Sequence, residues 1–355
     1  MNILQIKLKS KNYNIYIEKN IMNSAGKYIK DIYKGKKIAV VTDSNVDKLY
    51  SNVLLNSLSK EGFIVNKVVI EPGEKSKNMN TLIDIYKNFC SFKIRRSDLI
   101  IALGGGVVGD ITGFASSTYL RGVKYIQIPT TLLAQIDSSV GGKVAVDLPW
   151  GKNLIGNFYH PEAVFIDPNV LTSLSDKFFN DGMGEVIKYG FIKSSEFIDE
   201  LIKYKNKNEL LENIEKIIYR CCSIKKDLVQ KDEFDTGDRM LLNFGHTIGH
   251  SIEKVFNYNK YTHGECVAFG MAYITRKSEE FGYTSKGTYK VMREILNKYN
   301  LSYDVPKLDK NALFDAVALD KKTAFDYINV ILLKKIGEAY IVKLKLEEFK
   351  KYLDF

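Results

Sequence analysis

The first half of the chain alternates short apolar runs with longer amphipathic segments. The apolar runs cover residues 37–42, 63–70 and 98–103, and segments of helical period follow at 45–60, at 78–90 and after residue 104. Apolar runs of this length between helical segments are typical of parallel strands joined by crossover helices. Residues 1–9 alternate like a further strand. The pattern predicts an α/β domain with a parallel sheet covered by helices.

The pattern changes after about residue 167. Residues 196–204, 210–227 and 264–281 carry apolar positions at helical spacing, with few β-branched runs. Near the end, the apolar runs 327–333 and 338–343 flank a Lys-Lys-Ile-Gly segment and predict a small β-hairpin. We therefore expect two domains, an α/β domain over residues 1–167 and a mainly α-helical domain over residues 168–355. A chain of 355 residues suffices for a large core in each.

Composition indicates a globular protein and sets the expected compartment. Hydrophobic residues make up 45% and charged residues 26%, close to the globular average. The four cysteines form no Cys-x-x-Cys pair, so we expect reduced thiols and a cytoplasmic protein. The N-terminus lacks the apolar core of a signal peptide, and no run reaches the roughly 18 apolar residues of a membrane helix. We expect a soluble protein that does not contact membranes.

The net charge of +10 does not indicate nucleic-acid binding. Only seven of the 52 basic residues are arginine, and the lysines are scattered among Asp, Glu and Asn rather than gathered into a stripe. The lysines therefore predict a basic surface without a nucleic-acid partner. A locally positive cleft for an anionic small substrate remains compatible with this composition.

Histidines provide the strongest chemical signal. Three of the four lie in one region, as His246, His250 and His263. His246 and His250 are four residues apart and share one face of a helix, and His263 can return from a following turn. Imidazole is the commonest protein ligand of zinc, and a catalytic zinc takes three protein ligands. The cluster predicts a metal site, although the spacing leaves the third ligand open; the alternative is that these are ordinary helix and loop histidines.

A glycine-rich turn follows the apolar run 98–103. Gly104-Gly105-Gly106-Val107-Val108-Gly109-Asp110 has the order strand, glycine turn, helix, in which backbone N–H groups and a helix N-terminus can hold phosphate. The spacing Gly-x-Gly-x-x-Gly fits the dinucleotide pattern, but that match is weak alone, and a purely structural turn is the alternative. Asp43 and Asn45, after the run 37–42, can bond a ribose or carboxamide, and are equally good helix N-caps.

Five blocks of sequence, taken together, resemble the 3-dehydroquinate synthase family over nearly the whole chain. The blocks are Gly-Gly-Gly-Val-Val-Gly-Asp (104–110), Gln-Ile-Pro-Thr-Thr-Leu-Leu-Ala-Gln-Ile-Asp-Ser-Ser-Val-Gly-Gly-Lys (127–143), Gly-Lys-Asn-Leu-Ile-Gly (151–156), Glu-Val-Ile-Lys-Tyr (185–189) and Leu-Asn-Phe-Gly-His-Thr-Ile-Gly-His (242–250). The glycine turn alone would also fit glycerol dehydrogenases and iron-type alcohol dehydrogenases. The joint occurrence of the blocks, in order, is much more specific.

The resemblance implies a fold, a reaction and cofactors. The fold would be an α/β N-terminal Rossmann-like domain followed by a mainly α-helical C-terminal domain, as in dehydroquinate synthases, in a cytoplasmic homodimer. The enzyme would be a carbon–oxygen lyase of the shikimate pathway, which leads to the aromatic amino acids. It would convert 3-deoxy-D-arabino-heptulosonate 7-phosphate into 3-dehydroquinate and phosphate by transient oxidation, phosphate elimination, re-reduction and aldol closure. NAD and a divalent metal ion, commonly zinc or cobalt, would be bound.

Site residues carried over from the family occupy three groups. The metal ligands would be Glu185, His246 and His263. The NAD contacts would be Asp43, Asn45, Glu74, Lys77, Gly105, Gly106, Val107, Asp110, Thr130, Thr131, Lys152 and Asn153. The catalytic and substrate-binding residues would be Asp137, Lys143, Lys188, Lys225, Arg239, Asn243, one lysine of the pair Lys321-Lys322, and His250 as a substrate-side or proton-relay group. Arg121 would reach the substrate phosphate across the dimer interface.

Two departures from the family pattern concern local contacts. Where the family tends to read Thr-Leu-Pro-x-Arg-Glu, this chain has Ser-Leu-Ser-Asp-Lys-Phe (173–178), so an aromatic side chain replaces a carboxylate. Gly-Gly-Lys-Thr-Gly-Val-Asn becomes Gly-Gly-Lys-Val-Ala-Val-Asp (141–147). For Lys225, which Lys226 follows, an ordinary solvated side chain is the alternative to a substrate contact.

Three other functions compete with this interpretation. A sister sugar-phosphate cyclase would act on another substrate, although Lys188, Arg239 and Asn243 favour one that bears a carboxylate. A polyol dehydrogenase would show net conversion of NAD to NADH. A non-catalytic binding protein would not need metal, glycine-turn and cationic residues together.

Overall fold

The computed structural model describes residues 1–318, 323–324 and 327–353. The chain packs into two compact units: the first contains Met1–Leu174 and Leu211–Phe234, the second Ser175–Leu210 and Asp235–Phe355. A single division at residue 167 does not describe this arrangement, because residues 211–234 return to the first unit. The sequence pattern of that segment, an amphipathic helix among other amphipathic helices, gives no sign of this return.

The first unit is built on a mainly parallel sheet with the strand order β1-β2-β9-β6-β5-β3-β4. All neighbouring strands from β2 to β4 run parallel, and β1 pairs antiparallel with β2 at one edge. The strands are β1 (Asn2–Lys7), β2 (Asn12–Ile17), β3 (Lys37–Asp43), β4 (Ile64–Ile70), β5 (Leu99–Gly104), β6 (Lys124–Pro129) and β9 (Ala163–Ile166). The expected parallel sheet is confirmed, and the N-terminal strand adds an antiparallel edge to it.

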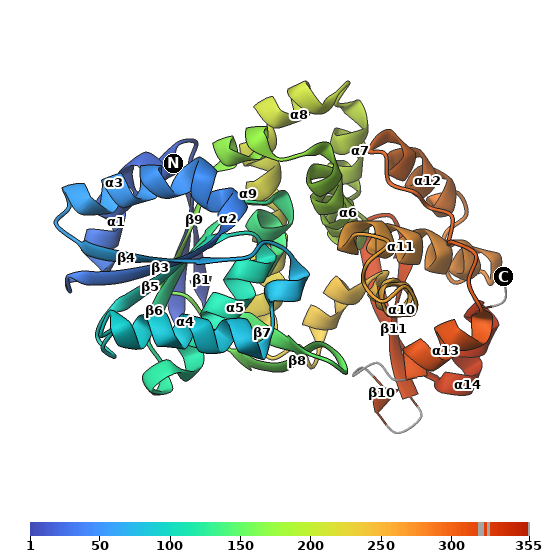
Figure 1. Cartoon of the computed structure of the whole chain (residues 1–355). Helices are drawn as coiled ribbons and strands as arrows, with labels where there is room; N and C mark the ends of the chain where they lie inside the picture. The colour runs from blue at the N-terminus through green and yellow to red at the C-terminus, as the bar shows by residue number, and fades with distance from the viewer. Residues whose placement is uncertain (319–322, 325–326, 354–355) are drawn as a thin grey trace. The chain divides into compact units, whose positions relative to one another are not determined.

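Helices cover both faces of this sheet (Figure 1). They are α1 (Ala25–Ile32), α2 (Ser44–Val46), α3 (Asn52–Lys60), α4 (Met79–Ser91), α5 (Gly106–Thr118) and α9 (Ile214–Lys231). Strand β3 shows how the core is divided, because Ile38 and Val40 pack with α1 and α3 whereas Ala39 and Val41 pack with α4 and α5. Alternate residues of a strand point to opposite faces, so a strand buried on both faces is apolar at every position.

A separate two-stranded hairpin completes the first unit. It consists of β7 (Lys143–Leu148) and β8 (Gly151–Phe158), which pair antiparallel. Val144 and Val146 of β7 are buried in the core beside α5, whereas Trp150 at the turn is 80% exposed. The hairpin therefore holds residue 143 at the start of a packed strand and residues 152–153 just after its turn.

The second unit is mainly helical. Its helices are α6 (Asp176–Lys193), α7 (Ser195–Lys203), α8 (Lys207–Glu212, which ends just inside the first unit), α10 (His246–Val255), α11 (His263–Glu280), α12 (Thr288–Lys298), α13 (Lys310–Ala318) and α14 (Leu346–Phe349). Its strands are β10 (Thr323–Ala324), β11 (Tyr327–Lys335) and β12 (Glu338–Lys345). Strands β11 and β12 form the expected antiparallel hairpin. One expected helix over residues 210–227 is wrong in detail, since α8 and α9 are separate helices.

The described residues bear on two expectations from the sequence, the absence of membrane helices and the reduced state of the cysteines. None of their helices combines the length and apolar character that a membrane crossing requires. Cys90, Cys221, Cys222 and Cys266 all lie in this part of the chain, and no disulfide joins them. Three of the four thiols are buried, which agrees with cysteine acting as a small core residue.

Candidate metal centre and cofactor-binding residues

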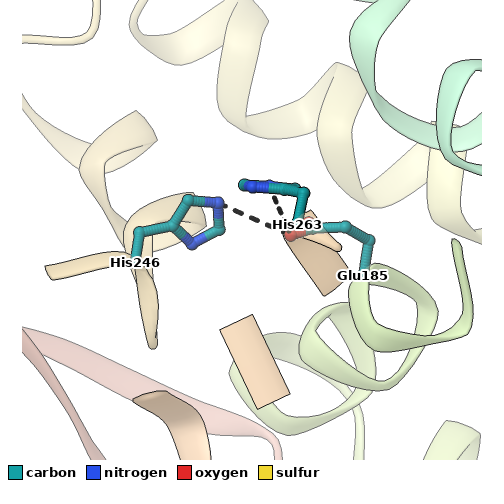
Figure 2. A group of neighbouring side chains, drawn as sticks. All are labelled: Glu185, His246 and His263. Carbon is teal, nitrogen blue, oxygen red and sulfur yellow. Dashed lines mark ion pairs between the residues drawn. The ribbon is translucent and has the colours of Figure 1, made fainter. Parts of the chain in front are cut away.

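Three helices of the second unit bring a carboxylate and two imidazoles together. Glu185 lies in the middle of α6, while His246 and His263 are the first residues of α10 and α11. Figure 2 shows both rings turned towards the carboxylate. The Nε2 atom of His246 lies 3.5 Å from Glu185 Oε1, and that of His263 lies 3.7 Å from the same oxygen. One potential ligand atom from each residue lies within 4.8 Å of the other two, a spacing that a single ion can bridge.

The remaining ring nitrogens have acceptors that fix both imidazoles. His246 Nδ1 donates to the carbonyl oxygen of Phe244 at 3.1 Å, and His263 Nδ1 lies 3.1 Å from Glu253 Oε1. A histidine that donates from Nδ1 presents Nε2 as the lone-pair nitrogen, which is how metal-bound histidines are oriented. Because both Nε2 atoms face a fully buried carboxylate, the donor set fits a divalent cation of the zinc or cobalt type.

The charges around Glu185 also suit a cation. Its side chain is completely buried, and the ammonium of Lys188, one turn further along α6, contacts its other oxygen. Burial alone would lower the pKa of His263, but the nearby carboxylates of Glu253 and Glu185 outweigh burial and raise this pKa well above its ordinary value. A proton on His263 would therefore compete with a metal ion for Nε2. A metal ion would replace that proton, so its affinity should fall as the pH is lowered.

A second grouping shares one of these histidines. His250, Glu253 and His263 also offer ligand atoms within 4.8 Å of one another. The ring centroid of His250 lies 5.1 Å from that of His246 and 5.8 Å from that of His263. The first grouping is favoured because Glu253 there serves as the Nδ1 partner of His263, the usual carboxylate–histidine–metal arrangement. In the first grouping His250 lies beside the proposed ligands and is not one of them.

Glycines allow the three helices to approach closely. A Cβ added at Gly264 would lie 1.9 Å from the carbonyl oxygen of Asp181 on α6, and one at Gly184 would lie 2.7 Å from the carbonyl oxygen of Gly264. A Cβ at Gly249 of α10 would lie 2.9 Å from the carbonyl oxygen of Cys266. The buried Asp181 carboxylate accepts a hydrogen bond from the N–H of Gly264, at 2.5 Å. Contacts between backbones thus set the positions of the residues beside each proposed ligand.

Replacing Gly264 with alanine should weaken metal binding without touching a ligand. The added methyl group meets backbone, which cannot rotate away, so α6 and α11 must separate; overpacking of this kind typically costs about 1–3 kcal/mol. We expect a lower melting temperature and a bound-metal fraction that recovers only at higher metal concentration. Glu280→Ala, at the exposed end of α11, is the matched control and should bind metal like the wild type. Unchanged metal affinity in the Gly264 variant would contradict this account.

In the first unit, the glycine turn joins the carboxyl end of β5 to α5. The carboxyl ends of β3 and β6 lie at the same edge of the sheet, which brings Asp43 and Thr130 to the level of the turn. No side chain caps the N-terminus of α5. Added Cβ atoms at Gly105 and Gly106 would lie 3.1 Å from Thr131 Cγ2 and 3.2 Å from Ser138 Oγ. Because these glycines carry no side chain and no side chain caps the N-terminus of α5, the backbone N–H groups of the turn can approach a pyrophosphate group.

Asp43 illustrates a residue with two possible roles. Its Oδ1 atom accepts hydrogen bonds from the N–H groups of Asn45 and Val46, so it is the N-cap of α2. Asn45 is exposed at the same sheet edge. Capping through Oδ1 fixes the carboxylate and does not exclude a ligand contact through its other oxygen.

Lys77 is the centre of a charged cluster in the first unit. Its ammonium lies 2.9 Å from Glu74 Oε1, 3.3 Å from Asp110 Oδ2 and 3.8 Å from Asp147 Oδ1, and Lys152 lies 3.7 Å from the same oxygen of Glu74. Burial would lower the pKa of Lys77, but the carboxylates raise it above its ordinary value. Burial raises the pKa of Asp110 to about 6, although Lys77 opposes this shift. Four proposed NAD contacts therefore form one interacting group.

The elevated pKa of Asp110 should be visible in the pH dependence of stability. Between about pH 4 and pH 6, folded Asp110 binds a proton that the unfolded chain has released, so the free energy of unfolding should fall as the pH rises through this range. The contribution is at most on the order of 3 kcal/mol. Asp110→Asn should remove it, whereas Asp84→Asn, at an exposed position of α4, should not. Urea unfolding at several pH values measures this; a constant difference between wild type and Asp110→Asn would contradict it.

The proposed substrate residues differ widely in exposure. Lys225 of α9 is buried, with its ammonium 2.6 Å from Asp137 Oδ1 and 2.5 Å from the Asp137 carbonyl oxygen, so a solvated side chain is excluded. Lys188 and Arg239 are buried in the second unit, where Asn243 is half-buried. Lys143 is exposed at the start of β7. The pair Lys321-Lys322 lies outside the described residues.

Arg121 lies away from the other proposed residues of its unit. It is exposed and follows α5, three residues before β6 begins, whereas Thr130 follows the last residue of β6. The six residues of β6 separate these two positions by about 20 Å. Arg121 therefore belongs to the amino-end edge of the sheet, opposite the glycine turn.

The two departures from the family pattern lie at Phe178, which is exposed, and in the segment that ends at Asp147, which joins the Lys77 cluster. Phe178 near the start of α6 is 52% exposed. Asp147 accepts a hydrogen bond from the N–H of Asn153, at 2.7 Å, and supplies the third carboxylate near Lys77. Burial raises the pKa of Asp147. The charge of the Lys77 cluster thus depends on a position at which this chain departs from the family.

Sequence reasoning missed Glu253 and Asp181. The spacing of Glu253, seven residues after His246 and three after His250, places it on the same face of α10, so helical periodicity could have indicated it. Asp181 precedes Glu185 by one turn of α6. Its bond to Gly264 is between helices and has no sequence signal.

Comparisons with known proteins identify relatives over the full length. Residues 67–181 match the family described as 3-dehydroquinate synthase N-terminal, and residues 182–323 match 3-dehydroquinate synthase C-terminal. A 3-dehydroquinate synthase of Clostridium kluyveri is 57% identical over 353 residues, which are 99% of this chain and 98% of that protein.

Two solved structures of related cyclases have similar folds. One is 2-deoxy-scyllo-inosose synthase complexed with carbaglucose-6-phosphate, NAD+ and Co2+, with a TM-score of 0.89, 26% identity and 99% of each chain covered. The other is 2-epi-5-epi-valiolone synthase from Streptomyces hygroscopicus subsp. jinggangensis with NAD+ and Zn2+ bound, with a TM-score of 0.88, 25% identity, and 98% of this chain and 97% of that chain covered.

Proposed function

Because the chain belongs to the 3-dehydroquinate synthase family, we propose that it converts 3-deoxy-D-arabino-heptulosonate 7-phosphate into 3-dehydroquinate and phosphate, as a lyase of the shikimate pathway. The observation that carries this proposal is the 57% identity to a curated synthase across almost the entire chain. The buried Glu185, with two imidazoles directed at it, supports the same activity, since the reaction needs a metal centre.

We propose that the chain binds NAD and one divalent metal ion. When bound, NAD would accept and return a hydride, while the metal ion would polarise substrate oxygens. Glu185, His246 and His263 would hold the metal ion. The glycine turn and the N-terminus of α5 would hold the pyrophosphate of NAD, and the Lys77 cluster, with Lys152 beside it, would bond the sugar hydroxyls.

The proposed substrate residues would act mainly through charge. Lys143, Lys188, Lys225 and Arg239 would neutralise the phosphate and carboxylate of the substrate, which lowers the barrier to releasing phosphate. Asp137 holds the Lys225 ammonium in one place, and Lys188 shares a buried environment with Glu185. His250 would transfer protons beside the metal ligands, and Asn243 would bond the substrate.

A homodimer would explain the position of Arg121. Within one chain this residue lies at the amino-end edge of the sheet, about 20 Å from the carboxyl end of β6. We propose that it reaches the substrate phosphate of a second copy. The cytoplasmic location stays a prediction from the sequence.

A sister cyclase is the nearest alternative function. The two cyclases with similar structures are 25–26% identical to this chain, far below the 57% of the dehydroquinate synthase. The buried Arg239 and Lys188, together with Asn243, also suit a substrate with a carboxylate. Both observations favour the heptulosonate phosphate.

The test is to incubate the purified protein with heptulosonate phosphate, catalytic NAD, and Zn²⁺ or Co²⁺. Phosphate and dehydroquinate should appear in equal amounts, while absorbance at 340 nm stays flat. Phosphate without dehydroquinate would indicate a sister cyclase. Net NADH formation with an added alcohol would indicate a polyol dehydrogenase. If neither phosphate nor dehydroquinate appeared, the proposal would be overturned.

A further inference from the structure

Hydrogen bonds from two other segments fix the glycine turn that precedes Lys143. Gly141 and Gly142 both have positive φ, 99° and 70°, so the chain reverses sharply just before β7. The hydroxyl of Tyr13 accepts a hydrogen bond from the N–H of Gly141 at 3.3 Å, and the N–H of Tyr159 donates to the carbonyl oxygen of Gly142 at 2.7 Å. The exposed side chain of Lys143 therefore extends from a backbone that is well anchored.

His160 closes the other side of this turn. It is the one histidine outside the proposed metal centre, and only 5% of it is exposed. A Cβ added at Gly142 would lie 2.6 Å from His160 Nδ1, so the imidazole packs directly on the glycine. The ring also stacks on Tyr13, with 5.8 Å between centroids. Residue 142 thus has no space for a side chain as long as His160 is in place.

The largely buried carboxylate of Glu233 contacts the imidazole and fixes its orientation. His160 Nε2 lies 3.1 Å from Glu233 Oε1, and since an ionised carboxylate only accepts, Nε2 carries the proton. Glu233 also accepts a hydrogen bond from Ser10 in the turn between β1 and β2. The rings of Phe158 and Phe234 pack edge to face beside this pair, 5.3 Å apart. Two adjacent contacts therefore join the end of β8 to the segment after α9.

We propose that His160, held by Glu233, is a positioning residue for Lys143. His160 does not touch substrate in this proposal; it presses on Gly142 and thereby sets the direction in which the Lys143 ammonium extends. A displacement of about 1 Å in a charged group can cost roughly a hundredfold in rate. This inference rests on the proposed function, because Lys143 is assigned to the substrate there.

The experiment compares three variants of the full-length protein, loaded with NAD and metal. His160→Gln can still donate to Glu233, His160→Phe keeps the ring contact but cannot donate, and His160→Ala loses both. We expect kcat/KM for heptulosonate phosphate to fall at least about tenfold in the Phe and Ala variants and less than about threefold in the Gln variant. Metal content and NAD affinity should stay unchanged, because His160 is not among the residues proposed to hold either group.

A double-mutant cycle with Lys143→Ala separates positioning from general damage. If His160 acts through Lys143, His160→Phe should lower kcat/KM less than about twofold once Lys143 is gone, at enzyme concentrations high enough to follow phosphate release. The same tenfold loss in both backgrounds, or an active His160→Phe protein, would overturn the inference. Wild-type turnover tests the proposed function separately, so the two failures are distinguishable.

Discussion

Replacing His246 with alanine is expected to remove the metal ion and all measurable turnover. The substitution deletes one of two imidazoles directed at the buried Glu185, and each ligand of a site of this kind contributes about 3 kcal/mol or more, which is at least about a hundredfold in metal affinity. Removal of the ion should abolish activity because the ion is the group proposed to polarise the substrate oxygens. Elemental analysis of the purified variant and the phosphate-release assay measure both effects.

His250→Ala is the matched control for this prediction. It lies one turn along the same helix, and its ring centroid is 5.1 Å from that of His246. We expect the His250 variant to retain metal and to lose turnover, because it would remove a proton-transfer group rather than a ligand. The opposite result, with metal lost from the His250 variant and retained in the His246 variant, would assign the ion to His250, Glu253 and His263 instead.

The hydrophobic pattern predicted the fold because the central strands of the parallel sheet, β3, β5, β6 and β9, are buried on both faces. Strand β3 contributes Ile38 and Val40 to one core and Ala39 and Val41 to the other, so its sequence is apolar without alternation. The return of α9 to the first unit was not predictable in this way. Periodicity shows that a helix has an apolar face, but it does not show against which unit that face packs.

Local spacing likewise placed His246 and His250 on one helix but left the third proposed ligand open. Glu185 lies on α6, and it approaches the histidines only because Gly184 and Gly264 let backbones come together. Such contacts between distant segments have no local signature; only the family resemblance pointed to this acid. Glu253 is different, since its position on the face of α10 was available from periodicity alone.

The second large effect is expected for Lys225→Met. This change leaves the Asp137 carboxylate, whose side chain is 23% exposed, without the ammonium that lies 2.6 Å away; breaking a fully buried ion pair typically costs about 3–5 kcal/mol, which is an upper limit for this partly buried pair. We expect a marked loss of stability in urea unfolding, together with a fall in kcat/KM of about a thousandfold or more, because a cation assigned to the substrate is removed.

The double variant Asp137→Asn/Lys225→Met separates these two consequences. With both charges gone, no uncompensated carboxylate remains, so most of the lost unfolding free energy should return, as it does when buried ion pairs are replaced together. Activity should stay low, because restored stability does not restore the positive charge. If turnover recovered together with stability, Lys225 of α9 would be only a structural partner of Asp137, and the charge that neutralises the substrate would have to come from Lys143, Lys188 and Arg239.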